Sequence, residues 1–316
     1  MIIAIEVLKL IIGFIMLIKG ADIFVDASVA VARRLKIPSI IIGLTIVAMG
    51  TSAPEVVIGI VASAGGSSDL AVGNVVGSNI FNLLFIVGLC AMIKPVTARF
   101  KEIARDYWVS VGGAAALLVM MFLLGDTLPR YVGAAFVVAF IVYMFILVRQ
   151  TMKNRDASKN GDTDDPKPPK SLVKSTIFGI LGLALIIIGA QLAVSSAESL
   201  ALTLGITERV IGITVIAVGT SLPELAIFLI SSKKGENDMA IGVIIGSNIF
   251  NILFVLGVSG IVMPLAIDSS MKIDLAVLIL GKLAFLLFAI TRRKITRLEG
   301  FTFVAMYVGY IAFIVL

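Results

Sequence analysis

Long apolar stretches separated by short polar segments run along almost the whole of this chain. A helix needs roughly 20 residues to cross a bilayer, and ten stretches of about this length lie near residues 2–18, 37–63, 70–93, 107–125, 131–149, 173–193, 206–231, 239–263, 273–290 and 299–316. The pattern predicts an all-α integral membrane protein with ten transmembrane helices. The first stretch lacks a basic leader and a small-residue cleavage site, so we expect it to remain as a helix.

Two phrases of the sequence occur twice, each time with an offset of 169 residues. Residues 43–55 read GLTIVAMGTSAPE and residues 212–224 read GITVIAVGTSLPE, with 8 of 13 positions identical. Residues 73–82, GNVVGSNIFN, match residues 242–251, GVIIGSNIFN, at 7 of 10 positions. We interpret the chain as a fused duplication.

Each copy of the duplication contains five of the predicted helices. Because five is odd, the second copy enters the membrane from the opposite side, so the two repeats are predicted to be inverted. Inverted repeats are typical of secondary transporters, whose substrate sites lie near the midplane on broken helices. The first half spans residues 1–149 and the second spans 172–316. Residues 150–171 between them are polar, mixed in charge and rich in proline, which favours a solvated linker over a regulatory element.

The basic residues indicate how the helices are oriented. In total 21 Lys and Arg residues lie in the central linker and in the loops after helices 1, 3, 7 and 9, whereas the alternate loops carry only Arg130, Arg209 and Lys272. By the positive-inside rule, the linker and the basic loops are cytoplasmic, and both termini lie outside the cell membrane. This asymmetry accounts for the net charge of +6, so no nucleic-acid partner is expected.

Composition narrows the chemistry further. Hydrophobic residues make up 59% of the chain and charged residues only 15%, which favours a lipid environment over that of a water-soluble globule. The chain has no histidine and a single cysteine, Cys90, which excludes histidine–cysteine zinc sites, a serine–histidine triad and an intramolecular disulfide. We therefore expect neither an enzyme nor a bound cofactor.

The first repeated phrase places a carboxylate, Glu55 or Glu224, inside an apolar stretch. A carboxylate at membrane depth is costly, and two of them in matching contexts indicate a functional site. Pro54 removes a backbone donor and Gly50 permits dihedrals that a helix does not use. Helices 2 and 7 are therefore predicted to break here and to free carbonyl oxygens between Ala48 and Thr51, for which a bound cation is a suitable partner.

The second repeated phrase adds neutral oxygen atoms of the kind that suit calcium and sodium. Ser78 and Asn82 lie four residues apart and share one helix face, as do Ser247 and Asn251. Taken singly, each of these residues is equally well explained as a packing group between helices. For the glutamates the alternatives are a protonated structural carboxyl or an ion pair. Lys282 is one available partner, but its default interpretation is snorkelling to the cytoplasmic interface.

The two phrases, Gly-Thr-Ser-x-Pro-Glu and Gly-Ser-Asn-Ile-Phe-Asn, resemble the repeats of the calcium/cation antiporter superfamily, most closely the prokaryotic sodium/calcium exchangers. The resemblance covers essentially the whole chain. It implies that Glu55 and Glu224 are central calcium ligands that also bind sodium. The resemblance implies further ligands in flanking sodium sites and at the middle of the cluster: the carbonyls of Thr51, Thr220, Ala48 and Ala217, the hydroxyls of Ser52, Ser78, Ser221 and Ser247, and the side chains of Asn82 and Asn251.

The chain departs from the family pattern at Asn251, where exchangers of this type commonly have an aspartate. The implied site then carries a formal charge of −2 from its two glutamates. This charge balances one calcium ion. The asparagine in place of an aspartate also removes one protonatable group from the site. The number of sodium ions and the ion preference are left open.

The function that follows is secondary active antiport of sodium against calcium by alternating access, at a shared site that holds either one calcium ion or several sodium ions. The resemblance further implies that helices 1 and 6 slide across the core. The main alternative is a proton-coupled antiporter of calcium or another divalent cation, whereas inverted repeats with occluding carboxylates disfavour a channel. The expected partners are calcium and sodium ions and the bilayer. A monomer is one of the oligomeric states left open.

Overall fold

The computed structural model describes residues 2–97, 100–125, 127–157, 171–204, 217–268, 271–292 and 294–315. This part of the chain is helical apart from four strands of two residues each. The helices are α1 (Ile2–Leu35), α2 (Ser39–Ile42), η1 (Gly43–Val47), α3 (Ala48–Thr51), α4 (Ala53–Ala64), α5 (Ser68–Ile80), η2 (Phe81–Ile86), α6 (Val87–Ile93), α7 (Phe100–Leu124), α8 (Arg130–Ala157), α9 (Leu172–Thr203), α11 (Ala217–Thr220), α12 (Leu222–Lys234), α13 (Asn237–Ile249), η5 (Phe250–Val255), α14 (Leu256–Val262), α15 (Met271–Arg292) and α16 (Arg297–Val315), where η marks π-helical turns. The strands are β1 (Val96–Thr97), β2 (Thr127–Leu128), β3 (Leu265–Ala266) and β4 (Lys294–Ile295).

The helices confirm the predicted all-α fold, with segments apolar enough to lie in a membrane. Within the described chain, seven helices are long and apolar enough to cross a bilayer, and the bent pair Ser39–Thr51 and Ala53–Ala64 raises this number to eight. The helix α1 is not among them because charged residues recur along its length. The predicted span 206–231 is described only from Ala217 onward, and residues 158–170 of the predicted linker lie outside the described residues. The number of ten spans stays a prediction.

Two of the apolar segments form the centre of the bundle. The apolar window of Asp69–Ile93 is 72% buried and that of Asn237–Val262 is 89% buried, whereas the other candidate spans of the described chain do not exceed 33%. The outer helices α7, α8 and α15 expose large apolar side chains such as Phe122, Phe145 and Leu287. Because lipid solvates such side chains, we expect the exposed surface of these helices to face the bilayer.

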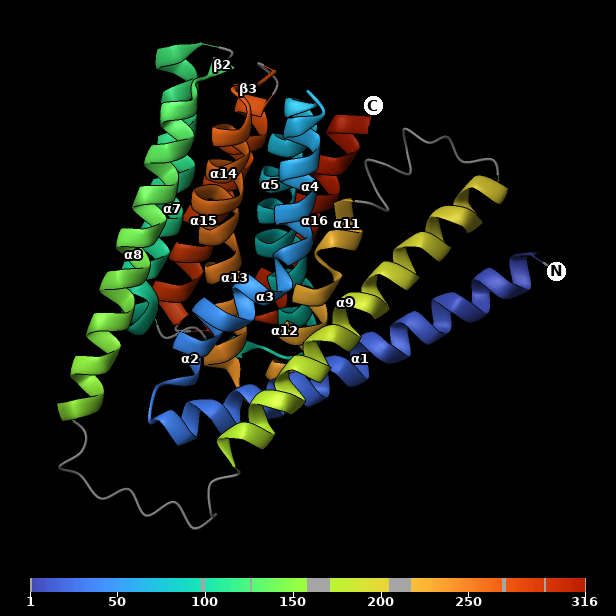
Figure 1. Cartoon of the computed structure of the whole chain (residues 1–316), viewed down its shortest axis with the longest axis vertical. Helices are drawn as coiled ribbons and strands as arrows, with labels where there is room; N and C mark the ends of the chain where they lie inside the picture. Colours follow the sequence, from blue (N-terminus) through green and yellow to red (C-terminus); the bar gives the residue numbers. More distant parts are fainter. Residues whose placement is uncertain are drawn as a thin grey trace.

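The helices α1 and α9 form a separate antiparallel pair that runs obliquely along one side of the bundle (Figure 1). Glycines allow their close approach, since a Cβ atom at Gly13 would lie 2.8 Å from the Gly189 carbonyl oxygen and one at Gly20 would lie 2.8 Å from the Gly182 carbonyl oxygen. Backbone atoms cannot move aside as a flexible side chain can. The pair therefore depends on small residues, as helix pairs in membranes commonly do.

Several elements of the first half have equivalents in the second half. The elements α5, η2 and β1 have counterparts of equal length in α13, η5 and β3. Each strand pair joins the two halves, because β1 pairs with β4 and β2 pairs with β3, both antiparallel. Phe81 stacks on Phe85 with ring centroids 4.9 Å apart, and Phe250 stacks on Phe254 at 4.8 Å. The duplication inferred from the sequence is thus matched by equivalent local structure.

Candidate cation-binding site

Each glutamate of the repeated phrase lies in the first turn of a helix, α4 or α12, directly after a break. Ser52 precedes α4 with φ −85° and ψ 14°, and Ser221 precedes α12 with φ −96° and ψ 7°, close to the sparsely allowed bridge region of φ/ψ space. Pro54 and Pro223 occupy the first turn, where a missing N–H leaves no helical bond unmade. The helix axis turns by 46° at the first break, which confirms the predicted break of helix 2.

Gly50 has a different role from the one predicted. It lies inside the short helix α3 and does not have a positive φ, so the chain turns at Ser52 instead. A Cβ atom at Gly50 would lie 3.0 Å from Leu183 Cδ2, and one at Gly219 would lie 2.3 Å from Val194 Cγ2. Both glycines therefore make room for α9, which carries Leu183 and Val194.

The prediction that the break frees the Ala48 carbonyl is wrong for this conformation. That oxygen accepts hydrogen bonds from the Ser52 backbone N–H at 3.0 Å and from the Thr51 hydroxyl at 3.1 Å. The second half differs, because the Ser221 N–H donates to the Val218 carbonyl at 3.1 Å. A cation that binds the Ala48 carbonyl has to replace the Thr51 hydroxyl.

Glu55 and Glu224 are both fully buried and lie close enough for their negative charges to repel each other. Ser52 donates a hydrogen bond to Glu224 Oε1 at 2.9 Å, and Ser247 donates to the same oxygen at 3.3 Å. The Thr220 side chain lies next to the Glu55 carboxylate. No described Lys or Arg forms an ion pair with either glutamate. Buried carboxylates without a basic partner are strongly disfavoured unless a cation compensates them.

The remaining predicted side chains are brought to the same place by helix packing. The glutamate-bearing helix α4 packs against α5 and η5, and α12 packs against α13 and η2. Several buried oxygen atoms of these elements make no hydrogen bond: Glu55 Oε1 and Oε2, Glu224 Oε2, Ser78 Oγ, Ser221 Oγ, Asn82 Oδ1 and Asn251 Oδ1. Buried polar atoms are normally satisfied, and a cluster of unsatisfied hard oxygens suits sodium or calcium.

The described residues contain no cluster of three or more His, Cys, Asp and Glu that could hold a metal ion. The charge at the site therefore comes from two carboxylates, and the other oxygens are neutral. Calcium affinity rises with the number of charged ligands and with the rigidity of the site. Two carboxylates balance the charge of one divalent cation.

Two residues of the second phrase, Asn79 and Asn248, were missed by the sequence analysis. The Asn79 side chain donates to the Asn248 carbonyl at 3.2 Å, and the Asn248 side chain donates to the Asn79 carbonyl at 3.5 Å. The Asn251 amide donates to Asn79 Oδ1 at 3.4 Å. These bonds join the two central helices and orient Asn251. The signal that could have found them is their identity in both copies of the phrase.

A cavity of about 410 Å³ leads toward the breaks from one side. It lies between α4, α9 and the α11–α12 turn, and its lining includes Pro54, Thr220 and Pro223 beside the breaks and Gln191 and Glu198 on α9. Because Gln191 is exposed, the cavity reaches the surface of the protein. The cavity therefore connects the surface of the protein with residues beside both helix breaks.

Known proteins share both the sequence and the fold of this chain. The family described as sodium/calcium exchanger protein matches residues 5–149 and 174–316. The putative antiporter CaxA of Alkalimonas amylolytica is 40% identical over 312 residues, covering 95% of each chain, and the sodium/calcium exchanger MaX1 of Methanosarcina acetivorans is 33% identical over 343 residues, covering 98% of each. A solved structure of the sodium-calcium exchanger NCX_Mj superposes with a TM-score of 0.85 at 32% identity and covers 99% of each chain.

Proposed function

Because this chain belongs to the sodium/calcium exchanger family, a family of membrane cation antiporters, we propose that it moves calcium across the membrane in exchange for sodium. The observation that carries the proposal is the buried pair of Glu55 and Glu224, which has no basic partner among the described residues and is surrounded by unsatisfied hydroxyl and amide oxygens. Such a site is complete only with bound cations. The NCX_Mj match supports the same class of transported ion.

The charge of the site accounts for exchange. One calcium ion balances two carboxylates, and sodium ions with their single charges use the same carboxylates together with neutral hydroxyl and carbonyl oxygens. The two ions compete because they share the glutamates. An empty site would expose two uncompensated carboxylates to a low dielectric, which raises the barrier to crossing between access states without an ion.

We assign the ligand roles that the family resemblance implies. Glu55 and Glu224 are central, and Asn82 and Asn251 lie at the middle of the cluster. The flanking sodium ligands are the hydroxyls of Ser52, Ser78, Ser221 and Ser247 and the carbonyls of Thr51, Thr220, Ala48 and Ala217. The unsatisfied oxygens of Ser78, Ser221, Asn82 and Asn251 support this assignment.

Ten spans in two inverted repeats complete the proposal. The equal lengths of α5 and α13 and of η2 and η5 support the duplication, and the antiparallel course of the equivalent helices α1 and α9 supports the inversion (Figure 1). Alternating access then consists of movement of the α1–α9 pair along the bundle, with both termini outside and the basic loops in the cytoplasm. The separate course of α1 and α9 supports this movement (Figure 1).

The test uses purified protein in vesicles loaded with sodium and diluted into sodium-free buffer that contains labelled calcium. We expect calcium uptake that Glu55→Ala and Glu224→Ala abolish, because each removes a central charge. Glu6→Ala is the matched control, since Glu6 pairs with Lys9 at the exposed surface of α1 and not at the site. Uptake driven equally well by a proton gradient in the absence of sodium would establish the proton-coupled alternative and contradict sodium coupling.

A further inference from the structure

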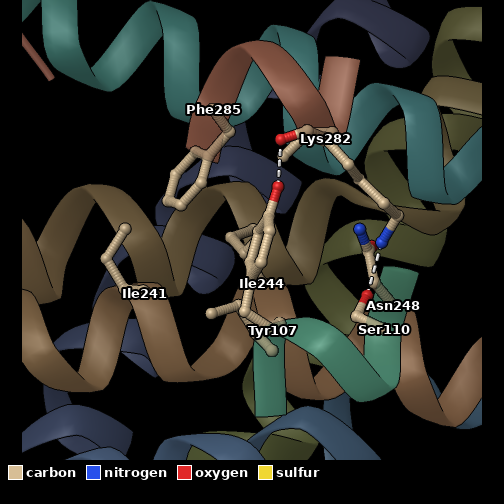
Figure 2. Close-up of a pocket in the computed structure, with 9 residues that line it drawn as sticks. Tyr107, Ser110, Ile241, Ile244, Asn248, Lys282 and Phe285 are labelled. Carbon is tan, nitrogen blue, oxygen red and sulfur yellow. Dashed lines mark hydrogen bonds between the residues drawn. The ribbon is translucent and has the colours of Figure 1, made fainter. Parts of the chain in front are cut away.

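Lys282 does not snorkel to the interface as predicted, because it is 1% exposed and lies in the core. Its side-chain Nζ donates a hydrogen bond to the Ser110 hydroxyl on α7, and its backbone carbonyl accepts one from the Tyr107 hydroxyl (Figure 2). No carboxylate of the described chain forms an ion pair with it. A buried amine without a counter-charge is unfavourable for folding, and inside a membrane protein it points to a functional role.

The position of Lys282 relative to the cation site is defined by Asn248. Both side chains line a cavity of about 10 Å³ (Figure 2), which is about the room of one water molecule. The Asn248 Oδ1 atom is buried and makes no hydrogen bond. On α13, Asn248 directly follows Ser247, whose hydroxyl donates to Glu224. One helix therefore separates Lys282 from the glutamates.

Hydrogen bonds between asparagines also connect the surroundings of Lys282 with the cation site. Asn248 and Asn79 exchange side-chain to backbone hydrogen bonds, and Asn79 accepts a bond from Asn251 at the site. All three asparagines are buried, so they keep bulk water away from the space between Lys282 and the site. The diameter of a helix is about 10 Å, and two charges at that separation inside a protein interact appreciably even at an effective dielectric constant of about 20.

We propose that Lys282 is a tethered positive charge that limits the cation charge held at the Glu55–Glu224 site and so makes bound calcium easier to release. This inference rests on the proposed function, because it requires that calcium and sodium bind between the glutamates. The lysine offsets part of the two negative charges, as a bound cation would, but it cannot leave. Removal of the positive charge makes the site bind cations more tightly.

Removal of the positive charge is expected to strengthen calcium binding, whereas damage to the fold would weaken it. We expect Lys282→Met to lower the dissociation constant for calcium by about tenfold or more, as a Coulomb interaction across one helix implies. Calcium carries twice the charge of sodium, so the half-saturating sodium concentration falls by about the square root of the calcium factor. Lys282→Arg keeps the positive charge, because arginine does not lose its proton in proteins, and is expected to leave calcium binding no tighter than in the unaltered protein.

The measurement is equilibrium binding of labelled calcium to the purified full-length protein in detergent, with sodium as competitor. Lys282→Gln serves as a second neutral variant if Lys282→Met does not fold. Tyr107→Phe removes the hydrogen bond to the Lys282 carbonyl but not the charge, and is expected to leave calcium affinity unchanged. If the unaltered protein binds no calcium, the proposed function fails. If it binds calcium but the neutral variants bind no tighter, or if Tyr107→Phe or Lys282→Arg has the same effect, only the role of Lys282 is overturned.

Discussion

The two site glutamates occupy equivalent positions but have different surroundings. Glu224 Oε1 accepts hydrogen bonds from Ser52 and Ser247, whereas Glu55 accepts none from the equivalent serines of the other half. The corresponding hydroxyls of the other half, Ser221 and Ser78, are buried without a partner. In this conformation two serines hold Glu224, whereas Glu55 lies beside Thr220 and the two serines equivalent to Ser52 and Ser247 are left for ions to satisfy.

This asymmetry predicts unequal effects of two equivalent substitutions on stability. In the absence of sodium and calcium, Ser52→Ala removes a hydrogen bond to a buried carboxylate and is expected to destabilise the protein by about 1.5–3 kcal/mol. Ser221→Ala removes no hydrogen bond to a protein group and is expected to have little effect on unfolding. The measurement is thermal unfolding in ion-free detergent solution. Equal shifts for the two variants would show that the halves are equivalent without ions.

At the scale of single elements, the α1–α9 pair depends on contact between backbones. A Cβ atom at Gly182 would lie 2.8 Å from the Phe24 backbone nitrogen and 2.9 Å from the Gly20 carbonyl oxygen, whereas one at Gly179, on the same helix, would meet only the Ala27 Cβ at 3.7 Å. Gly182→Ala is therefore expected to force the helices apart and to destabilise the protein by about 1–3 kcal/mol. Gly179→Ala is the control and is expected to be neutral or slightly stabilising in thermal unfolding.

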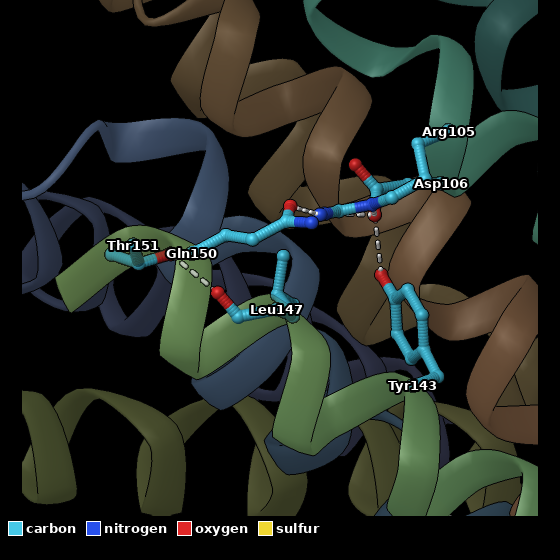
Figure 3. A network of polar contacts seen from close by, with 6 residues as sticks. All are labelled: Arg105, Asp106, Tyr143, Leu147, Gln150 and Thr151. Atoms are coloured by element: carbon cyan, nitrogen blue, oxygen red, sulfur yellow. Dashed lines mark hydrogen bonds and ion pairs between the residues drawn. The ribbon is translucent and has the colours of Figure 1, made fainter. Parts of the chain in front are cut away.

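The helices α7 and α8 are held together by a polar network at one end (Figure 3). Asp106 is buried and accepts hydrogen bonds from the Tyr143 hydroxyl at 3.1 Å and from Arg105 Nη2 at 2.6 Å. Arg105 also donates to Gln150 on α8. The network satisfies a carboxylate that would otherwise be uncompensated. We expect its buried members to contribute more to the free energy of unfolding than its exposed members.

Tyr143→Phe tests this network. The substitution removes one donor to the Asp106 carboxylate while Arg105 remains, and we expect a loss of about 1 kcal/mol in the free energy of unfolding. Tyr131→Phe is the matched control on the same helix, because Tyr131 is 63% exposed and has no hydrogen bond in the described chain. Calcium binding is expected to be unchanged in both variants. An equal loss of stability in the two variants would contradict a role for the network.

The sequence predicted the break of helix 2 because Pro54 cannot donate a backbone hydrogen bond, and α4 begins directly after Ser52 with Glu55 in its first turn. It did not predict the π-helical turns at Phe81–Ile86 and Phe250–Val255. Such turns depend on how neighbouring helices pack and have no marker residue. The burial of Lys282 and the helix-spacing role of Gly50 were missed for the same reason, because both depend on which helix lies opposite.

At the scale of the whole molecule, one ion-pair cluster connects the α1–α9 pair to the bundle. Lys234, the last residue of α12, lies 2.8 Å from Asp22 Oδ1 and 2.6 Å from Asp26 Oδ1 on α1. The helix α12, which carries Glu224 in its first turn, thus ends against α1. Movement of α1 along the bundle has to break this cluster, which is partly exposed and therefore weak enough to break during transport.

A reducible cross-link at this point tests whether the movement is required for exchange. In a Cys90→Ala background, Asp26→Cys and Lys234→Cys are joined by a short reducible thiol reagent, which fixes α1 to the bundle. We expect the cross-linked protein to bind calcium normally, because neither residue contacts the glutamates, but to lose sodium-driven calcium uptake until a reductant restores it. The matched control is a disulfide between Ala27→Cys and Gly179→Cys, whose Cβ atoms would lie 3.7 Å apart, within the usual disulfide range. It joins α1 to α9 inside the moving pair, so uptake is expected to persist. Persistence of uptake when α1 is fixed to the bundle would mean that the ions gain access without movement of the α1–α9 pair. Loss of uptake in the control would mean that α1 and α9 do not move as one unit.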